Sequence, residues 1–548
     1  MRLIIAVLLM IGAGITEGCT PSEAVNVFIR INQNGYRQDD VKTGIVFSEK
    51  VLDGVNYVVI NTQNNKKIIS GNLGQSLGTW GRFKHNYEID FSALKDPGTY
   101  QIQIRNNKSH DFRISNDIYS GVTENLIDFF RVQRCGPTNP MLHGLCHNFD
   151  SPYIAGDSLF GKVDVTGGWH DAGDYIKFVN TAAFTTYMLL FAYDFDPVRF
   201  GFDRDNSGAP DVLEEARIGL DWLLRCNYKP GGLITQVQDL RDHEVGWRLP
   251  EDDPLRYERP AFKGIGKNII GIYSAALALG SRIWKAKFYD DDYSRRLLES
   301  AENIYRLKGS APDLDTAPSG MYQDQKFEGK LALGAFELFS ATSKGSYLKD
   351  SKDYAATAGP DYWWSWGDVN SLAHYRLATE DPKYLGYIEN NLTHWNHLSD
   401  STVYGDIGVY PWGTTHLLFG VILNNILYTK VTGNSQFESL AQKQMDYILG
   451  KNPWGISFVS GVGKTYTKHF HLQITYLKGI GLPGGIAAGP TSQDVLKNYQ
   501  IERKPSGLDL FNSDNVKYFD DRNDYITNEP TIVTNATAVF VFGMLNRK

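Results

Sequence analysis

The stretch HDFRISNDIYSGVTENLIDFFRVQ, residues 110–133, marks the point at which the chain changes its pattern. Residues 110–114 alternate polar and apolar side chains, as a half-buried strand does. From residue 119 the apolar residues recur at the helical interval, which predicts a helix over residues 119–133. The sequence therefore predicts a β domain before this point and a helical domain after it. The short junction at residues 115–119 favours close packing of the two.

Toward the N-terminus, short apolar runs are separated by turn signals such as Asn64-Asn65 and Asp96-Pro97-Gly98. This spacing is typical of a small β-sandwich, which we place at residues 25–115. The predicted strands cover residues 27–31, 43–47, 55–60, 87–91, 99–104 and 110–114.

Toward the C-terminus, a helical period recurs in about twelve segments joined by long loops rich in Gly and Asp. The clearest predicted helices cover residues 119–133, 211–225, 268–284, 293–307, 329–341, 414–428, 437–449 and 533–545. We assign residues 119–548 to an all-helical domain. Periodicity alone leaves open an α/α barrel of six hairpins or an irregular bundle.

Residues 1–18 predict a signal peptide, because Arg2 precedes an apolar run, residues 3–14, that is too short to cross a bilayer. Cys19 stands where a bacterial lipoprotein is cleaved and acylated. Glu17 is unusual in that lead-in, so an ordinary secretory cut is the alternative. We expect an exported protein, either a lipoprotein of the bacterial cell surface or periplasm or a secreted one, and a monomer.

The composition disfavours some partners and favours others. A formal net charge of -7 and a pI near 6.0 give no basic field for nucleic acid or an anionic membrane. Aromatic residues make up 13% of the chain, with 11 Trp and 31 Tyr, which suits stacking on a ligand such as a sugar. Beyond Cys19, only Cys135, Cys146 and Cys226 remain, an odd number that argues against a disulfide framework.

The loop Gly167-Gly168-Trp169-His170-Asp171-Ala172-Gly173-Asp174-Tyr175 places two carboxylates three residues apart among small and aromatic residues. Such a pair can converge on one water molecule, with like charge and hydrogen bonds tuning which is the base. The alternative is a capped, Gly-rich turn with solvated acids.

A second acidic cluster, residues 520–529, ends at Glu529 just before an apolar helix. Cleavage of a glycosidic bond needs one acid to protonate the leaving oxygen and one carboxylate on the other face of the sugar. The two clusters could supply them, although a helix N-terminus also favours an acid through its dipole.

The sequence resembles glycoside hydrolase family 9 over nearly its whole length. The similarity runs in order through Asn32-Gln33-Asn34-Gly35-Tyr36, Asp96-Pro97-Gly98-Thr99-Tyr100, Gln133-Arg134-Cys135-Gly136, Cys146-His147, Asp171-Ala172-Gly173-Asp174, Pro210-Asp211-Val212-Leu213-Glu214-Glu215, Asp446-Tyr447-Ile448-Leu449-Gly450-Lys451-Asn452-Pro453 and Asn528-Glu529.

The resemblance implies an N-terminal Ig-like domain, an (α/α)6 barrel and inverting hydrolysis of a β-glucan. It implies Asp174 as the base, Asp171 as its assistant and Glu529 as the acid. One departure concerns substrate: this chain has His469-Phe470-His471-Leu472 where the family has a His-His-Arg run that helps to hold the sugar. His469 and His471 remain candidate sugar ligands.

Two metal sites are predicted. Cys135, Cys146, His147 and His170 offer sulfur and imidazole donors suited to a structural zinc, which the resemblance also implies. The alternatives are two reduced buried thiols and, for His170, a side chain that faces the sugar. The resemblance favours a structural calcium around Ser207, Gly208, Asp211 and Glu214 or Glu215. A capped helix start is the alternative there.

Several aromatic residues fall in predicted loops or at helix ends, where indole faces can stack on pyranose rings or pack in the core. We select Trp169 and Trp412 as substrate-binding candidates, with Tyr525 beside Glu529. His243 also looks like part of a subsite loop, unless it only caps that loop.

These features predict an endo-acting β-1,4-glucanase acting on cellulose-like, mixed-linkage or xyloglucan chains. An exo-acting β-glucosidase or cellobiohydrolase is one alternative. An inactive, surface glycan-binding lipoprotein is the alternative of another class, which the presence of both Asp174 and Glu529 disfavours.

Overall fold

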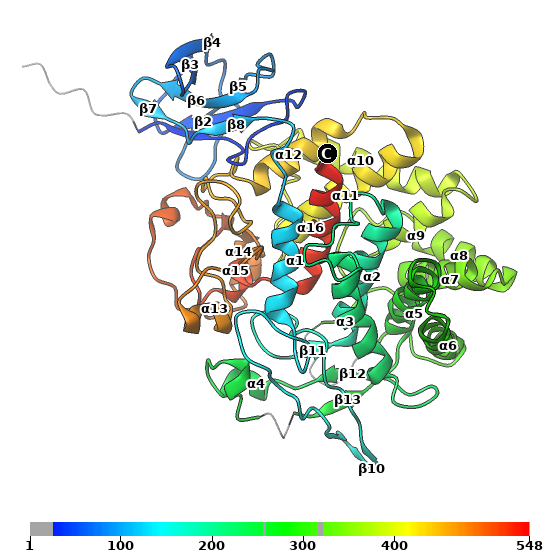
Figure 1. The fold of residues 1–548 in the computed structure, drawn as a ribbon. Coiled ribbons are helices and arrows are strands. Elements are labelled where there is room, and N and C mark those ends of the chain that lie inside the picture. The colour runs from blue at the N-terminus through cyan, green and yellow to red at the C-terminus, as the bar shows by residue number, and fades with distance from the viewer. Residues whose placement is uncertain (1–25, 256–258, 316–321, 547–548) are drawn as a thin grey trace, which may run out of the picture.

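The computed structural model describes residues 26–255, 259–315 and 322–546. Its N-terminal part is an antiparallel β-sandwich (Figure 1). One sheet has the order β1-β2-β5 and the other the order β4-β3-β6-β7, with β8 also paired to β6. The strands are β1 (Phe28–Arg30), β2 (Thr43–Ser48), β3 (Asn56–Asn61), β4 (Lys66–Asn72), β5 (His85–Asp90), β6 (Gly98–Ile104), β7 (Asn107–Lys108) and β8 (Phe112–Ile114).

Six predicted strands are present, and the structure adds β4 and β7. β4 forms a hairpin with β3 across the turn that contains Asn65, whose φ of 56° lies in the left-handed region that Asn tolerates. The sequence of β4 is mostly polar because this edge strand is largely exposed, so no apolar run marks it.

The helical part is an (α/α)6 barrel, not an irregular bundle. Six inner helices contact one another in a closed ring, and each has an outer helix packed against it. The inner helices are α2 (Val179–Phe195), α5 (Lys267–Ile283), α7 (Glu328–Thr342), α9 (Asn370–Leu377), α11 (Thr414–Thr432) and α16 (Ile532–Leu545). The outer helices are α1 (Val122–Gln133), α3 (Asp211–Cys226), α6 (Asp291–Tyr305), α8 (Gly345–Ala358), α10 (Lys383–Ser399) and α12 (Glu438–Ile448).

All eight helices with the clearest sequence signal are present, with ends shifted by a few residues. Helix α2 was not among them because it is buried on nearly every side, so its sequence has no apolar stripe. Within the described ranges, no helix is long and apolar enough to cross a membrane. The predicted signal peptide and Cys19 lie outside those ranges.

Short strands and helices lie within the loops that connect the barrel helices. They are strands β9 (Tyr153–Ile154), β10 (Asp157–Lys162), β11 (Lys177–Phe178), β12 (Ile234–Val237), β13 (Ala261–Lys263), β14 (Thr491–Ser492) and β15 (Val516–Lys517), and helices α4 (Arg241–Glu244), α13 (Gln473–Lys478), α14 (Gln493–Leu496) and α15 (Tyr525–Asn528).

The sandwich and the barrel share one interface. Strand β2 is buried on both faces, since Val46 packs inside the sandwich while Phe47 joins the core of the barrel. Arg30 donates through Nε to Pro453 O at 3.0 Å, and its guanidinium lies 4.6 Å from the ring of Phe511. Asn32 donates to Asp446 on α12 at 2.9 Å. These contacts make the sandwich a brace for the barrel (Figure 1).

Gln33 provides a test of this brace. Its amide donates to Gly455 O at 2.7 Å and accepts from the backbone N–H groups of Lys464 and Thr465 at 3.1 and 2.8 Å. Gln33→Ala removes all three hydrogen bonds and leaves the buried Gly455 carbonyl unpaired, at a cost of about 1–3 kcal/mol. We expect calorimetry to show that the sandwich and the barrel unfold in one transition, and that Gln33→Ala lowers its melting temperature by several degrees. Gln38→Ala, which removes exposed hydrogen bonds within the sandwich, should leave it nearly unchanged. Two separate transitions would contradict the brace.

Candidate active site

The predicted catalytic loop is fixed to the end of α1 by its backbone. Gly167 and Gly168 have φ values of 89° and 75°, which side chains disfavour, and a Cβ on Gly168 would lie 2.7 Å from the Trp222 ring. His170 N donates to Gln133 O at 2.8 Å, and Cys135 N donates to Gly168 O at 2.9 Å. The glycines thus allow the tight path that brings Asp171 and Asp174 to the start of α2.

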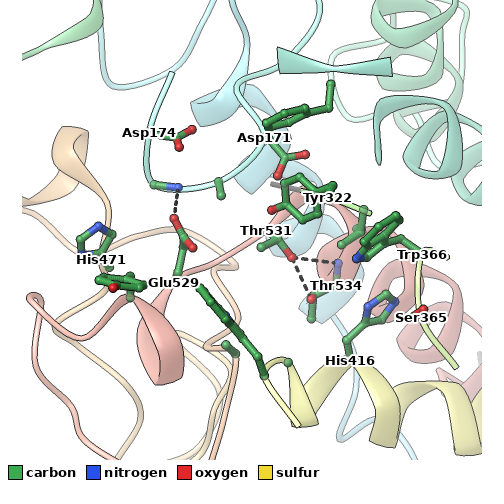
Figure 2. A pocket seen from close by; sticks show the side chains of 18 of the residues that line it. Asp171, Asp174, Tyr322, Ser365, Trp366, His416, His471, Glu529, Thr531 and Thr534 are labelled. Atoms are coloured by element: carbon green, nitrogen blue, oxygen red, sulfur yellow. Dashed lines mark hydrogen bonds between the residues drawn. The ribbon is translucent and has the colours of Figure 1, made fainter. Parts of the chain in front are cut away.

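Asp171 is a buried residue of the cavity lining. Its carboxylate accepts a hydrogen bond from the Thr181 hydroxyl, and the Tyr322 side chain lies beside it (Figure 2). Burial raises the pKa of Asp171 to about 7, against the opposing effect of these two hydroxyl groups. Asp171 is therefore easier to protonate than an exposed carboxyl group.

Asp174 is held by two donors from different directions. Its Oδ1 accepts from Ile176 N at 3.1 Å, and its Oδ2 lies 2.9 Å from His243 Nε2 on α4. The hydrogen bond to Asp174 raises the pKa of His243. These contacts orient the Asp174 carboxylate as a general base requires.

Glu529 enters the site from the far end of the chain, between α15 and α16. Its Oε1 accepts from Gly173 N at 3.1 Å, which places it beside the Asp174 loop (Figure 2). Burial, which removes water from the carboxylate, is the main cause that raises the pKa of Glu529 to about 8, and the nearby charge of Asp174 is the second. Glu529 therefore carries a proton at neutral pH, as a general acid must.

All three carboxylates line a cavity of about 690 Å³. Figure 2 shows His471 on one side of Glu529 and Trp366, Ser365 and His416 on the other. The lining also includes Trp412, which is 42% exposed and packs against Tyr499 and Tyr525 at ring distances of 5.4 and 5.7 Å. Acids in the middle and aromatic rings at the sides suit a chain of sugars.

Two of the predicted sugar ligands, Trp169 and His469, do not line the cavity. Trp169 is only 1% exposed and donates through its indole N–H to Glu215 at 3.2 Å, so it is a core residue. His469 lies outside the cavity lining and points to Asp520, with 3.3 Å between Nδ1 and Oδ2. By contrast, His243, His471, Trp412 and Tyr525 all line the cavity.

The predicted zinc ligands Cys135, Cys146, His147 and His170 meet in one buried cluster. Their ligand atoms all lie within 4.8 Å of one another. Two thiols and two imidazoles form a donor set that fits a tetrahedral structural zinc. His147 has a positive φ of 47°, a strained conformation typical of a functional position. Its other nitrogen, Nε2, lies 3.0 Å from Asp253, as the outer partner of a metal-bound histidine does.

Arg248 links this cluster to the loop that carries His243. Its Nε donates to Asp253 at 3.0 Å, and its other nitrogens donate to Asp242, including the Asp242 carbonyl at 3.2 Å. Asp242 in turn accepts from Tyr175 N at 3.2 Å. One buried arginine therefore connects the Cys and His cluster to Asp242, the neighbour of His243, and through Asp242 to Tyr175, the neighbour of Asp174.

Three of the predicted calcium residues contact arginines in this structure, and the other two contact Asp203. Both carboxylate oxygens of Asp211 accept from Arg204, and Glu215 accepts from Arg134. Glu214 lies 3.7 Å from Arg131. The Ser207 and Gly208 N–H groups donate to Asp203 at 3.0 and 2.9 Å. A cation here would compete with these guanidinium groups, and the calcium site stays a prediction.

Sequence reasoning missed Tyr322 and Arg248. Tyr322 lies beside Asp171 and packs against Phe178 and Trp366, at ring distances of 4.9 and 5.2 Å, so its neighbours come from distant segments. No local motif signals such a residue.

Comparison with known proteins agrees with this geometry. The family model described as Glycosyl hydrolase family 9 matches residues 119–542, and the model described as Cellulase N-terminal ig-like domain matches residues 25–109. The crystal structure of a metagenome-derived glycoside hydrolase family 9 endoglucanase superposes with a TM-score of 0.80 and 25% identity, covering 95% of this chain and 99% of that one.

Two curated relatives match most of this chain. A xyloglucan-specific endo-beta-1,4-glucanase of Bacteroides ovatus is 24% identical, over 97% of this chain and 96% of that protein. A cellulose 1,4-beta-cellobiosidase of Acetivibrio thermocellus is 25% identical, over 94% of this chain and 67% of that protein.

The raised pKa of Glu529 predicts a pH-dependent effect on stability. The folded state holds this proton up to pH about 8, whereas the unfolded chain releases it near 4.5. The wild type therefore loses stability as pH rises between these values. Glu529→Gln keeps the acceptor for Gly173 and has no proton to lose.

We expect the melting temperature of Glu529→Gln to exceed that of the wild type by a margin that is small below pH 4.5 and grows toward pH 8. The exposed Glu299→Gln on α6 serves as the control. A margin that does not change with pH would contradict the buried, protonated state of Glu529.

Proposed function

The chain belongs to glycosyl hydrolase family 9, and we propose on that premise that it is an inverting endo-β-1,4-glucanase. The observation that carries the proposal is the pairing of Asp174 and Glu529 in one cavity. Hydrogen-bond donors orient the Asp174 carboxylate, as the role of base requires, and the raised pKa of Glu529 favours its protonated form at neutral pH.

In the proposed reaction, Asp174 takes a proton from a water molecule while the water oxygen attacks the anomeric carbon. The bond from that carbon to the leaving oxygen breaks, and Glu529 gives its proton to that oxygen. Asp171 assists by holding the same water, with Tyr322 and Thr181 fixing its carboxylate. Solvent then returns the proton from Asp174 to Glu529, which resets the pair.

For the substrate, we propose cellulose-like, mixed-linkage or xyloglucan chains. The aromatic lining of the cavity supports a flat, β-linked sugar chain, and the Bacteroides ovatus relative is named for xyloglucan. The exo-acting alternative has its own support, since another relative is named a cellobiosidase at a similar identity. The endo mode is preferred because the metagenome-derived structure carries the name endoglucanase.

We further propose that the Cys135, Cys146, His147 and His170 cluster binds zinc. A bound zinc would supply structural support, since four protein ligands leave no open position. It would fix His170, whose neighbour Asp171 enters the active site. We also propose export of the protein, with a lipid anchor at Cys19.

Hydrolysis assays test the enzymatic proposal. We expect purified wild type to release mixed oligosaccharides from soluble β-glucans, with separation by size as the measurement. Glu529→Gln should lower the rate by about 100-fold to 10,000-fold, because it cannot donate the proton. Release of only mono- or disaccharide would replace the endo mode with the exo mode. Absence of turnover on every β-glucan would favour the glycan-binding alternative.

Elemental analysis tests the zinc proposal, with Cys226 as an internal control. Cys226 is buried like the cluster thiols but lies outside the cluster. We expect about one zinc ion per chain in the wild type and in Cys226→Ser, and loss of zinc with a lower melting temperature in Cys135→Ser. Zinc retained at full occupancy in Cys135→Ser would refute this assignment.

A further inference from the structure

Arg522 has an unusual set of contacts. Its guanidinium lies 3.7 Å from the centre of the Tyr476 ring and 5.8 Å from that of Trp247. Within the described part of the chain, no ion pair or side-chain hydrogen bond is found for it. Its carbonyl oxygen receives the Nδ1–H of His471 at 2.6 Å, which ties Arg522 to a residue that lines the cavity.

These residues form a path that leads outward from the catalytic acid. His471 lies beside Gly173 and Glu529, and its ring meets Trp247 edge-on at 5.1 Å. Trp247 lines the cavity and meets Tyr476 edge-on at 5.2 Å. Tyr476, on α13, is 46% exposed and lies outside the cavity lining. The aromatic surface therefore continues past the cavity to the solvent.

The chemistry of this surface suits a sugar unit. An aromatic ring offers a flat apolar face, and the planar guanidinium offers five N–H donors in a rigid fork that can bond neighbouring hydroxyls. Stacking on Tyr476 limits the rotamers of Arg522, so less entropy is lost when it binds. Arg522 also supplies a cation on the side of the cleft where the His469-Phe470-His471-Leu472 run carries none.

We propose that Trp247, Tyr476 and Arg522 form an outer subsite that binds a neutral sugar unit of the β-glucan, beyond the units held in the cavity. The proposal rests on the proposed function of the cavity. Because the subsite lies outside the cavity, only chains long enough to reach past His471 occupy it. It therefore determines a preference for longer substrates and leaves the bond-breaking step unaffected.

Two variants separate the contributions of Arg522. Arg522→Met keeps an apolar stem and removes every donor, while Arg522→Lys keeps the charge and removes the fork. Arg217→Met is the matched control, since the Arg217 guanidinium lies 3.5 Å from the Tyr293 ring centre on the outer helices, in a similar stacked pair away from the cleft.

The first measurement is kcat and KM on β-1,4-linked glucose oligosaccharides of three to six units. We expect Arg522→Met to raise KM about tenfold on the longest, with kcat unchanged and little effect on the shortest one cleaved. Arg522→Lys should recover part of the loss, and Arg217→Met should match the wild type. An equal effect at every length, or none at any length, would overturn the subsite.

Binding to catalytically inactive protein separates this proposal from the proposed function. In the Glu529→Gln background, calorimetric titration should show that Arg522→Met weakens binding of the six-unit chain about tenfold and leaves the three-unit chain unchanged. This result supports the subsite even if the wild type hydrolyses none of these chains. Equal binding of the six-unit chain with and without Arg522→Met would refute the subsite while leaving the hydrolase proposal intact.

Discussion

The site depends on one close approach of two backbone segments. Gly173 N donates to Glu529 across a separation of 356 residues in the sequence. A methyl group at Gly173 would lie 2.1 Å from the carbonyl oxygen of His471 and 3.1 Å from Glu529 Oε1. Backbone atoms cannot yield by that amount without moving the loop. The absence of a side chain at Gly173 therefore sets how near Glu529 comes to Asp174, and so how strongly the charge of Asp174 raises the pKa of Glu529.

The barrel makes this approach possible. The Asp174 loop leads into α2 and the Glu529 loop leads into α16, and these inner helices are neighbours in the ring. The alternation of outer and inner helices returns the chain to the same end of the barrel before each inner helix begins. Residues distant in sequence thus reach one cavity, and loops can change the substrate without disturbing the ring.

The catalytic loop is also held from the side away from Glu529. His170 places one end of the loop in the Cys and His cluster, and Tyr175 places the other against Asp242. Arg248 joins the two through Asp253 and Asp242. Every partner in this network is buried and charged or polar, so losing one would leave others unpaired at a high cost. The network therefore connects the Cys and His cluster, which lies outside the cavity lining, to the loop that carries Asp174.

The sequence was most informative where short motifs and periodicity carry the structure. The change from strand-like to helical spacing of apolar residues located the boundary between the two domains. The closely spaced Asp171 and Asp174 both line the cavity. Prediction failed where the residue type does not show which way the side chain points. Trp169 follows two glycines in the loop that carries Asp171 and Asp174, yet its indole points to Glu215 in the core. It also failed for Tyr322 and Arg522, whose surroundings are assembled from segments far apart in the chain. The sequence likewise shows Asp211 but not that Arg204 donates to it in the fold, and the calcium site stays a prediction.

In the proposed mechanism, Asp174 activates water on one face of the sugar while Glu529 protonates the leaving oxygen on the other. Proton NMR of the newly formed reducing end, during the first minutes of hydrolysis of a β-glucan, tests these two roles together. We expect the α-anomer to appear first and then to convert slowly to the equilibrium mixture. Initial release of the β-anomer would show retention and would contradict the roles assigned to these two carboxylates.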